Sequence, residues 1–546
     1  MGCTTSHEQI ILIGPVIGLV THNSARVIVE FSEDDKVTAI LKSDSKSYST
    51  TIQVEKEKVA VFKFEGLSPE TKYTFSVERV EKQIPSGFKT LPEKLSERPF
   101  KIAIGGCDDL IFNNKLGENS LYYEIADRAK SGDLDLIIHN GDQVYIDHKE
   151  HHWNPLHTNV YDNCYKLIHE KEKNKWVLYE EEIVHKMKDL YRKTWSGKVA
   201  EAMANCPNLM QYDDHEIHNN FGYEDKFTDQ NDAHSFVVKC ARRVYYEYQR
   251  QLREDIDYIS FSDVTCDYFS YVLNNVGFFF LDHRGARSTW YNAKFYLGKK
   301  QIDSLKSCLT DKFKDCPIVI ILSQNPLVIH NYEESRKDEE FEEFIYNDKE
   351  KYGEFLTMLD DHKKNTKQEI FLVGGDVHVG GHTEIYKNGV PCFKQIVSSG
   401  IGQRTKESII KYCKKVLAQT DTNLPGGFSF KHHDWSHNRN YATVELKLVN
   451  NSPVIESYLT ISDIDIKPSK QPTIISTTFS ISSSTTPNNQ GNNLGDNQGN
   501  TEGNNEDEED FEDVGVEQDD NVQHGHMFSN KGIPVVEVKP DKTKKR

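Results

Sequence analysis

Four polar clusters in the middle of the chain combine residue types that bind metal ions. Three follow apolar runs directly, and the fourth lies in a loop between them; they are Cys107-Asp108-Asp109, Asp142 with Tyr145, Asp213-Asp214-His215-Glu216, and Asp376 with His378. Thiolate, carboxylate and imidazole groups are the usual protein ligands of transition metals. Asp142 and Tyr145 are three residues apart in one loop, so both can face one point. A carboxylate beside a phenolate suits a hard trivalent cation, so the sequence predicts a metal-binding site here.

Buried strands must hold these clusters in place. Apolar runs at 102–104, 136–138 and 370–373 are bounded by polar or small residues, which is typical of short strands buried on both faces. A helix-like stretch from Leu121 to Lys130 precedes the second run. Gly141 permits a sharp turn that brings Asp142 to the carboxyl edge of its strand. That edge is where open α/β sheets bind ligands.

The order of the clusters resembles a known family. Gly141-Asp142-x-x-Tyr145, then Asp213-Asp214-His215-Glu216, then Gly375-Asp376-x-His378 is similar to the calcineurin-like metallophosphoesterases. A strand ending in Cys107, together with Asn219-Asn220 after the Asp-Asp-His-Glu motif, narrows the resemblance to the PhoD-like alkaline phosphatase D branch. The resemblance covers residues 99–465. It implies an α/β fold, specifically a four-layer metallophosphoesterase β-sandwich flanked by helices.

The resemblance also implies a dinuclear site. Asp142 would bridge two metal ions, which such sites hold roughly 3.5–4 Å apart. Strong thiolate and phenolate donors favour Fe³⁺ at the first position, and the second would take Ca²⁺, Mn²⁺, Fe²⁺ or Zn²⁺. The expected ligands are Cys107, Tyr145 and His378 for the first ion, and Asp214 and Asp376 for the second. His215 matches the position of a histidine that donates a proton or stabilises the transition state.

Five further residues are expected to contact the substrate or to support the metal ligands: Asn219, Asn220, Arg284, His139 and Asn325. Asn219 or Asn220 is expected to offer an amide to the second metal or to the phosphate. Arg284 is expected to contact the phosphate or to form a structural salt bridge, and His139 to be a supporting or structural residue. Many metallophosphoesterases have another histidine where this chain has Ser323-Gln324-Asn325-Pro326, so occupancy of the second metal site stays open.

The activity that the resemblance implies is phosphoester hydrolysis. A metal-bound hydroxide would attack phosphorus in line, without a covalent phosphoenzyme, on either monoesters or diesters. The alternative is a catalytically inactive, membrane-anchored adaptor that keeps this fold as a scaffold. Retention of the motif residues favours the enzyme.

The residues before the motifs predict a separate small domain at 10–92. Apolar runs at 26–31, 37–41, 51–54, 59–64 and 73–77 read as short strands, and 10–20 reads as another, with turns expected at Gly14-Pro15 and Ser68-Pro69. The stretch from Leu67 to Tyr73 resembles the tyrosine corner of fibronectin type III domains, and 87–92 resembles their closing strand. We expect a β-sandwich that serves as a spacer.

Composition separates a C-terminal tail from the folded part. Ser, Thr, Asn, Gln and Gly dominate from residue 466, and the acidic run 506–510 follows, so 466–546 is expected to be a disordered tail with unknown partners. The formal charge of −19 over 546 residues argues against nucleic-acid binding, which needs a basic surface. Ten cysteines without CxxC pairs fit a reducing compartment.

The first residues match an acylation pattern. Met1-Gly2-x-x-x-Ser6 fits N-myristoylation of Gly2, and Cys3 is a natural second acylation site. Stable anchoring takes two signals, so residues 1–9 are expected to be a lipid-anchor segment. The expected location is the cytoplasmic face of a membrane, or otherwise the cytoplasm.

Overall fold

A computed structural model describes the chain at residues 9–109, 121–147, 159–222, 225–227, 229–256, 266–285, 297–329, 349–402, 420–462 and 474–475. Gly2, Cys3 and the acidic run of the tail lie outside these residues. The chain divides into two compact units, 1–484 and 485–546, and every described residue belongs to the first. Among the described helices, none combines the length and apolar composition needed to span a bilayer.

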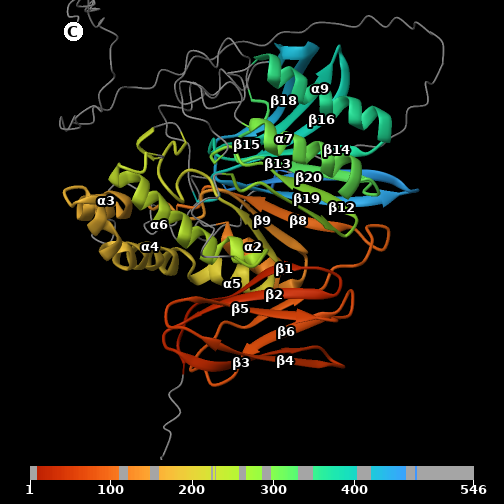
Figure 1. Cartoon of the computed structure of the whole chain (residues 1–546). Coiled ribbons are helices and arrows are strands. Elements are labelled where there is room, and N and C mark those ends of the chain that lie inside the picture. Colours follow the sequence, from red (N-terminus) through yellow and green to blue (C-terminus); the bar gives the residue numbers. More distant parts are fainter. Residues whose placement is uncertain are drawn as a thin grey trace, which may run out of the picture. The chain divides into compact units, whose positions relative to one another are not determined.

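The first described domain is an all-β sandwich (Figure 1). One sheet has the order β1-β2-β5 and the other β4-β3-β6-β7. Their bounds are β1 Ile11–Val20, β2 Ser24–Phe31, β3 Asp35–Lys42, β4 Ser47–Val54, β5 Val59–Glu65, β6 Lys72–Val77 and β7 Ser86–Lys89. The backbone N–H of Ser68 donates to the Tyr73 hydroxyl at 3.0 Å, which is the tyrosine-corner contact. The domain therefore fits the fibronectin type III type expected from the sequence.

One turn prediction in this domain is wrong. Gly14 and Pro15 lie inside β1, whose pairing with β2 shifts register between Ile13 and Val16. Gly14 has φ +97°, a left-handed value that glycine adopts without steric cost. A β-bulge therefore absorbs the irregularity, and the strand continues past it.

Two larger sheets form the second domain. The first has the order β10-β9-β8-β19-β20-β21 and the second β11-β12-β13-β14-β16-β15-β18-β17. The first comprises β8 Phe100–Gly105, β9 Leu136–Asn140, β10 Asn208–Gln211, β19 Asn440–Val449, β20 Ser452–Ile461 and β21 Ile474–Ile475. The second comprises β11 Phe269–Leu273, β12 Val276–Phe280, β13 Ile318–Leu322, β14 Glu369–Gly374, β15 Gly380–Lys387, β16 Val390–Ser398, β17 Thr420–Leu424 and β18 Phe428–Ser436. Each sheet contains a run of neighbouring parallel strands: β8, β9 and β10 in one, and β12, β13, β14 and β16 in the other.

Helices cover the outer faces of both sheets (Figure 1). Their bounds are α2 Tyr122–Ser131, α3 Val160–Ile168, α4 Glu180–Thr194, α5 Gly197–Asn205, α6 Ala233–Tyr248, α7 Gly298–Ser307 and α9 Lys349–Thr366. Buried side chains of β8 and β9 share one core with those of β12, β13 and β14 between the sheets. A second core lies under α7 and α9, and a third joins the helices α2 to α6 to the first sheet. The domain is therefore the expected four-layer α/β sandwich.

One strand near the site was not predicted. The Asp-Asp-His-Glu motif lies in a loop, as expected, but this loop directly follows a further buried strand, β10. After the same loop comes α6, which ends at Tyr248 and is followed by a short 3₁₀ turn, Arg250–Leu252. Asn208 and Gln211 make β10 look polar, but Asn208 is buried and its amide donates to three backbone carbonyls, one of them Ile17 at 2.9 Å.

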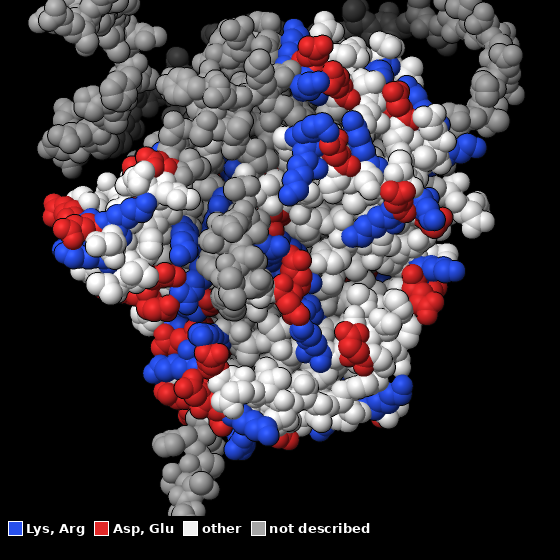
Figure 2. All heavy atoms as spheres, viewed as in Figure 1, with Lys and Arg blue, Asp and Glu red and all other residues white. Residues whose placement is uncertain are grey.

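Acidic and basic side chains are interspersed over the described residues on the face shown in Figure 2. Many of them form ion pairs, for example Lys447 with Glu456 at 2.8 Å and Lys351 with Glu354 at 2.7 Å. Exposed pairs of this kind contribute about 0–1 kcal/mol each to folding. Surface charge therefore contributes little to holding the site in place, and the buried contacts described below matter more.

Candidate metal centre

The carboxyl ends of the parallel strands in both sheets converge on one site. Cys107 follows β8, Asp142 follows β9, Asp213 and Asp214 follow β10, and Asp376 follows β14. The donor atoms of Cys107, Asp142 and His378 lie within 4.8 Å of one another, and so do those of Asp142, Asp213, Asp214 and Asp376. The edge predicted from the sequence is therefore the place where the donors meet.

The first donor group surrounds the Asp142 carboxylate. Asp142 Oδ2 lies 3.5 Å from Cys107 Sγ and 3.2 Å from the Tyr145 hydroxyl oxygen. The same hydroxyl lies 3.5 Å from His378 Nε2. The Cys107 thiol is also 3.0 Å from Ser399 Oγ, which accepts the His378 backbone N–H at 3.0 Å. One thiol, one carboxyl, one phenol and one imidazole thus face a common point.

The second donor group consists of Asp142, Asp213, Asp214 and Asp376, and a buried arginine lies against it. The Arg284 guanidinium, 1% exposed, pairs with Asp213 and lies 3.2 Å from Asp214 Oδ1 and 3.5 Å from Asp376 Oδ2. Asn325 donates its side-chain N–H to Asp376 Oδ2, and its Oδ1 is buried without a hydrogen-bond partner in the described part of the chain. One guanidinium does not balance four clustered carboxylates, so the surplus negative charge and the orphaned amide oxygen fit a cation.

His215 lies at the edge of both donor groups. Its ring stacks on Tyr145, with centroids 4.1 Å apart, and its backbone N–H donates to Asp142 Oδ1 at 3.1 Å. Asp147 Oδ1 lies 2.7 Å from His215 Nδ1, and Asp147 Oδ2 accepts the Asn219 backbone N–H at 2.5 Å. Because Asp147 is buried and makes both contacts, it fixes the orientation of the imidazole ring.

Several donors sit on left-handed backbone. The φ angles are +55° at Cys107, +59° at Asp142, +65° at Asp376 and +55° at His378. A residue with a Cβ in this region costs on the order of 1 kcal/mol or more. Gly141 has φ +99°, and a Cβ there would come within 2.5 Å of Asp213 Cβ. The sharp turns therefore bring the loops after β9 and β10 into direct contact.

Burial and mutual repulsion shift the acid–base properties of the donors. Burial, then the Asp214 carboxylate, raises the pKa of Asp142 well above its usual value. Burial, then Asp142 and Asp376, likewise raises the pKa of the Cys107 thiol. A cation bound at this point would reverse both shifts, because it stabilises the ionised ligands. The donor set therefore fits a metal ion, because it combines carboxyl, thiol, phenol and imidazole groups.

Comparison with known proteins identifies the fold and the family. A family model described as PhoD-like phosphatase matches residues 106–448. The chain belongs to the PhoD-like phosphatase family. It is therefore a phosphatase-type hydrolase, which confirms the resemblance inferred from the motifs. Residues 8–92 match a model described as a domain of unknown function (DUF7800).

Two solved structures share the fold. A structure of PhoD aligns with a TM-score of 0.60 at 14% identity, covering 87% of this chain and 92% of that one. Purple acid phosphatase PPD1 from yellow lupin (Lupinus luteus) seeds aligns with a TM-score of 0.53 at 13% identity, covering 86% and 74%. Comparison with curated protein sequences gives no match.

Most residues proposed from the sequence for this PhoD-like site meet there. Those that the structure brings together are Cys107, Asp142, Tyr145, Asp214, His215, Arg284, Asn325, Asp376 and His378. Arg284 forms the structural ion pair that was one of its two expected roles. His139 instead points to Asn208, with Nε2 at 2.9 Å from Oδ1, and it supports the β9–β10 pairing.

Asn219 and Asn220 contact the site through their backbone. The N–H of Asn219 donates to Asp147, and that of Asn220 donates to Asp214 Oδ2 at 2.6 Å. These contacts orient the two carboxylates. Both side chains are exposed, and a contact of either amide with the second metal or the phosphate stays a prediction.

Sequence reasoning missed three residues of the site. Asp147 was not singled out, because an aspartate in a polar stretch carries no signal of its partner. Ser399 follows β16 and gives no signal either. Glu216 stood in the motif, yet its role was not assigned: it accepts the backbone N–H groups of Asp142 at 3.0 Å and Asp213 at 2.8 Å. Its place in the Asp-Asp-His-Glu motif was the one available signal.

Proposed function

We propose that the chain hydrolyses phosphate monoesters or diesters with two metal ions. Cys107, Asp142, Tyr145 and His378 would hold Fe³⁺, and Asp214 and Asp376 would hold a divalent ion, Ca²⁺, Mn²⁺, Fe²⁺ or Zn²⁺. The single observation that supports this best is the convergence of both donor groups on the shared Asp142 carboxylate. A carboxylate with two oxygens is suited to bridging a pair of ions.

The bound ions would supply positive charge to the phosphoryl oxygens and lower the pKa of a bound water. The chain's own residues would handle the leaving group. Because Asp147 binds Nδ1 of His215 at 2.7 Å, the other ring nitrogen, Nε2, is the proton donor to the leaving oxygen. Burial alone would lower the pKa of His215, but the carboxylates of Asp147, Asp214 and Asp142 outweigh it and raise that pKa well above its usual value. Asp147, the first of these carboxylates and not one of the proposed metal ligands, favours the protonated imidazole.

The test is the metal content of the purified full-length protein, measured by elemental mass spectrometry beside its visible absorption. We expect iron close to one per chain and a tyrosinate-to-iron absorption band that disappears in Tyr145→Phe. Tyr122→Phe is the matched control, because Tyr122 is also a buried phenol, but its hydroxyl lies 3.4 Å from His139 Nδ1 and it is not one of the proposed metal ligands.

Activity is measured on p-nitrophenyl phosphate and bis(p-nitrophenyl) phosphate after reconstitution with iron plus each divalent ion. No tightly bound metal and no hydrolysis of either substrate would refute the proposal. That outcome would favour the inactive adaptor.

We also propose that acylation of Gly2 and Cys3 holds the enzyme at the cytoplasmic face of a membrane, where phosphoesters of the membrane surface are within reach. Two acyl chains are enough for stable anchoring. Mass spectrometry of the N-terminal peptide from cells tests this. An unmodified N-terminus would contradict it.

A further inference from the structure

A buried carboxylate of the N-terminal β-sandwich reaches into the catalytic domain. Glu30 lies in β2 and is fully buried. Its oxygens accept hydrogen bonds from Arg192 Nη2 at 2.8 Å, in α4, and from the Tyr248 hydroxyl at 2.8 Å, at the end of α6. A buried charge is tolerated only with such partners. Glu30 therefore ties α4 and α6 to the sandwich.

The next contacts lead from these two helices towards the loops that carry Asp142 and Asp214. The rings of Tyr191 and Tyr248 stack, with centroids 4.8 Å apart and planes 14° from parallel. Gln249, fully buried, donates from Nε2 to the Tyr191 hydroxyl and to Glu216 Oε1, each at 3.1 Å. A continuous set of buried contacts thus joins Glu30 to Glu216.

Glu216 connects this set of contacts to the loops of the metal centre. Its two oxygens accept three backbone N–H groups: Asp142 at 3.0 Å, Gln143 at 2.6 Å and Asp213 at 2.8 Å. These amides belong to the loops after β9 and β10. The position of Glu216 therefore sets the distance between the loop that carries Asp142 and the loop that carries Asp214.

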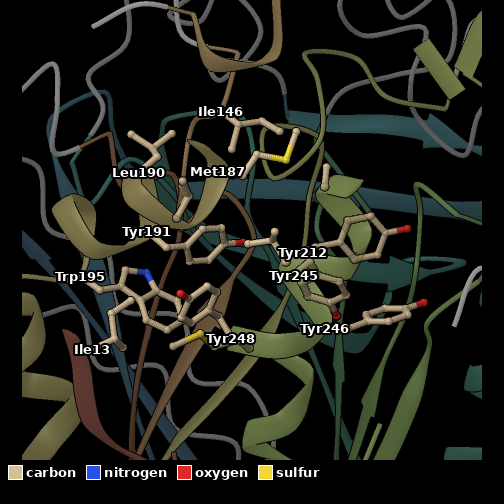
Figure 3. Packing of buried hydrophobic residues seen from close by; sticks show 14 of the residues in the cluster. Ile13, Ile146, Met187, Leu190, Tyr191, Trp195, Tyr212, Tyr245, Tyr246 and Tyr248 are labelled. Atoms are coloured by element: carbon tan, nitrogen blue, oxygen red, sulfur yellow. The ribbon is translucent and has the colours of Figure 1, made fainter. Parts of the chain in front are cut away.

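Apolar packing makes the same connection rigid. Ile13, Val16 and Ile28 of the sandwich share one core with aromatic residues of α4 and α6, and Figure 3 shows Ile13 with Tyr191, Trp195 and Tyr248. A Cβ at Gly18 in β1 would collide with the Leu252 carbonyl. Close backbone approach and a shared core leave little room for the two parts to move against each other.

We propose that Glu30 is a positioning residue of the metal centre, acting through Tyr248, Tyr191, Gln249 and Glu216 on the loops that hold Asp142 and Asp214. The sandwich is then part of the catalytic apparatus, and the expectation of a mere spacer is replaced. The proposal rests on the proposed function for its catalytic consequence, but the geometric consequence can be measured without any activity.

The first experiment is amide hydrogen exchange on the full-length chain, comparing the wild type with Glu30→Gln and Tyr248→Phe. Tyr248→Phe removes a single hydroxyl and keeps the stacked ring, so it covers the case in which Glu30→Gln does not fold. The matched control is Asp255→Asn, because Asp255 pairs with Arg26 at 2.9 Å and Lys63 at 2.5 Å across the same interface without contacting Glu216.

In Glu30→Gln we expect amides at Asp142, Gln143 and Asp213 to exchange about tenfold faster than in the wild type, with β13 and β14 unchanged. In Tyr248→Phe the same amides should exchange about threefold faster than in the wild type, and in Asp255→Asn less than about twofold faster. Unchanged exchange at these amides would overturn the proposal. So would an equal increase across the whole domain, since that indicates global destabilisation.

The second experiment is a double-mutant cycle on turnover with Glu30→Gln and Gln249→Leu. We expect kcat to fall about tenfold in each variant and no further in the double variant, because residues in one network are not additive. KM should stay within about twofold, since loop spacing matters most for the transition state. Additive losses would overturn the proposal. A wild type without activity would refute the proposed function instead, and exchange would still decide the role of Glu30.

Discussion

Replacing Asp147 with asparagine tests how the imidazole of His215 is held. The substitution keeps the size of the side chain and removes the charge that lies 2.7 Å from His215 Nδ1. Burial alone would raise the pKa of Asp147, but the contact with His215 outweighs it and lowers that pKa, so the carboxylate is charged at neutral pH. A hydrogen bond between charged groups contributes about 1.5–3 kcal/mol. At about 1.4 kcal/mol per tenfold in rate, kcat/KM should fall by roughly 10- to 150-fold.

The sign of the pH effect follows from the same contact. Asp147 raises the pKa of His215, so the protonated acid persists to higher pH in the wild type. In Asp147→Asn the fall in activity on the alkaline side should begin at lower pH. The loss should also be larger for phenyl phosphate than for p-nitrophenyl phosphate, because a poor leaving group depends more on protonation.

Glu384→Gln is the control for this prediction. Glu384 forms another carboxylate–histidine pair, with His433 Nε2 at 3.1 Å, further along β15 from the site. Its loss should leave kcat/KM for both substrates within about twofold of the wild-type values. If Asp147→Asn lowered kcat/KM by the same factor for both substrates and kept the wild-type pH profile, His215 would not be the general acid.

Three other changes probe the same loops. Cys107→Ser should weaken iron retention by about 10- to 100-fold on dialysis against a chelator, because an alcohol replaces the thiolate; equal retention would remove Cys107 from the ligand set. Gly141→Ala, which places a Cβ within 2.5 Å of Asp213 at φ +99°, should lower the free energy of unfolding by about 2 kcal/mol or more in urea titrations; a loss below about 0.5 kcal/mol would contradict the packing described. The metal-free protein should melt at a lower temperature at pH 8 than at pH 5. Burial raises the pKa of Asp142 and raises that of Glu216 from 4.5 to about 7. Because both acids are protonated more readily in the folded state, folding loses stability as the pH rises through these pKa values. Added metal should remove that difference, and a flat pH dependence without metal would refute the reasoning.

Long apolar runs made most strands and the main donors predictable. β9 and β14 are buried throughout and β8 at four of its six residues, so their apolar runs stop abruptly before Cys107, Asp142 and Asp376. The parallel arrangement brings those ends together. β10 could not be predicted because it has only four residues, two of them polar. Its buried Asn208 and Gln211 donate their side-chain N–H groups to distant parts of the chain, among them Ile17 and Asn140. A polar residue gives no local sign that its partner lies elsewhere in the chain.

The same limit explains the residues that sequence reasoning did not place. Asp147 meets His215 across 68 positions, and Glu216 meets Asp142 across 74. Neither spacing belongs to a helix or strand period, so only the folded chain reveals the pair. Glu30 is further removed, because it acts across two domains and its own sequence reads as an ordinary strand residue.

The left-handed backbone at Cys107, Asp142, Asp376 and His378 has a consequence for engineering this enzyme. Glycine would adopt these φ angles without the steric cost that each side chain incurs. A variant library selected for thermal stability alone would therefore enrich glycine at these four positions and discard the metal donors with it. Stabilisation of this scaffold is best confined to the surfaces of α7 and α9, and any selection should measure metal retention as well as melting temperature.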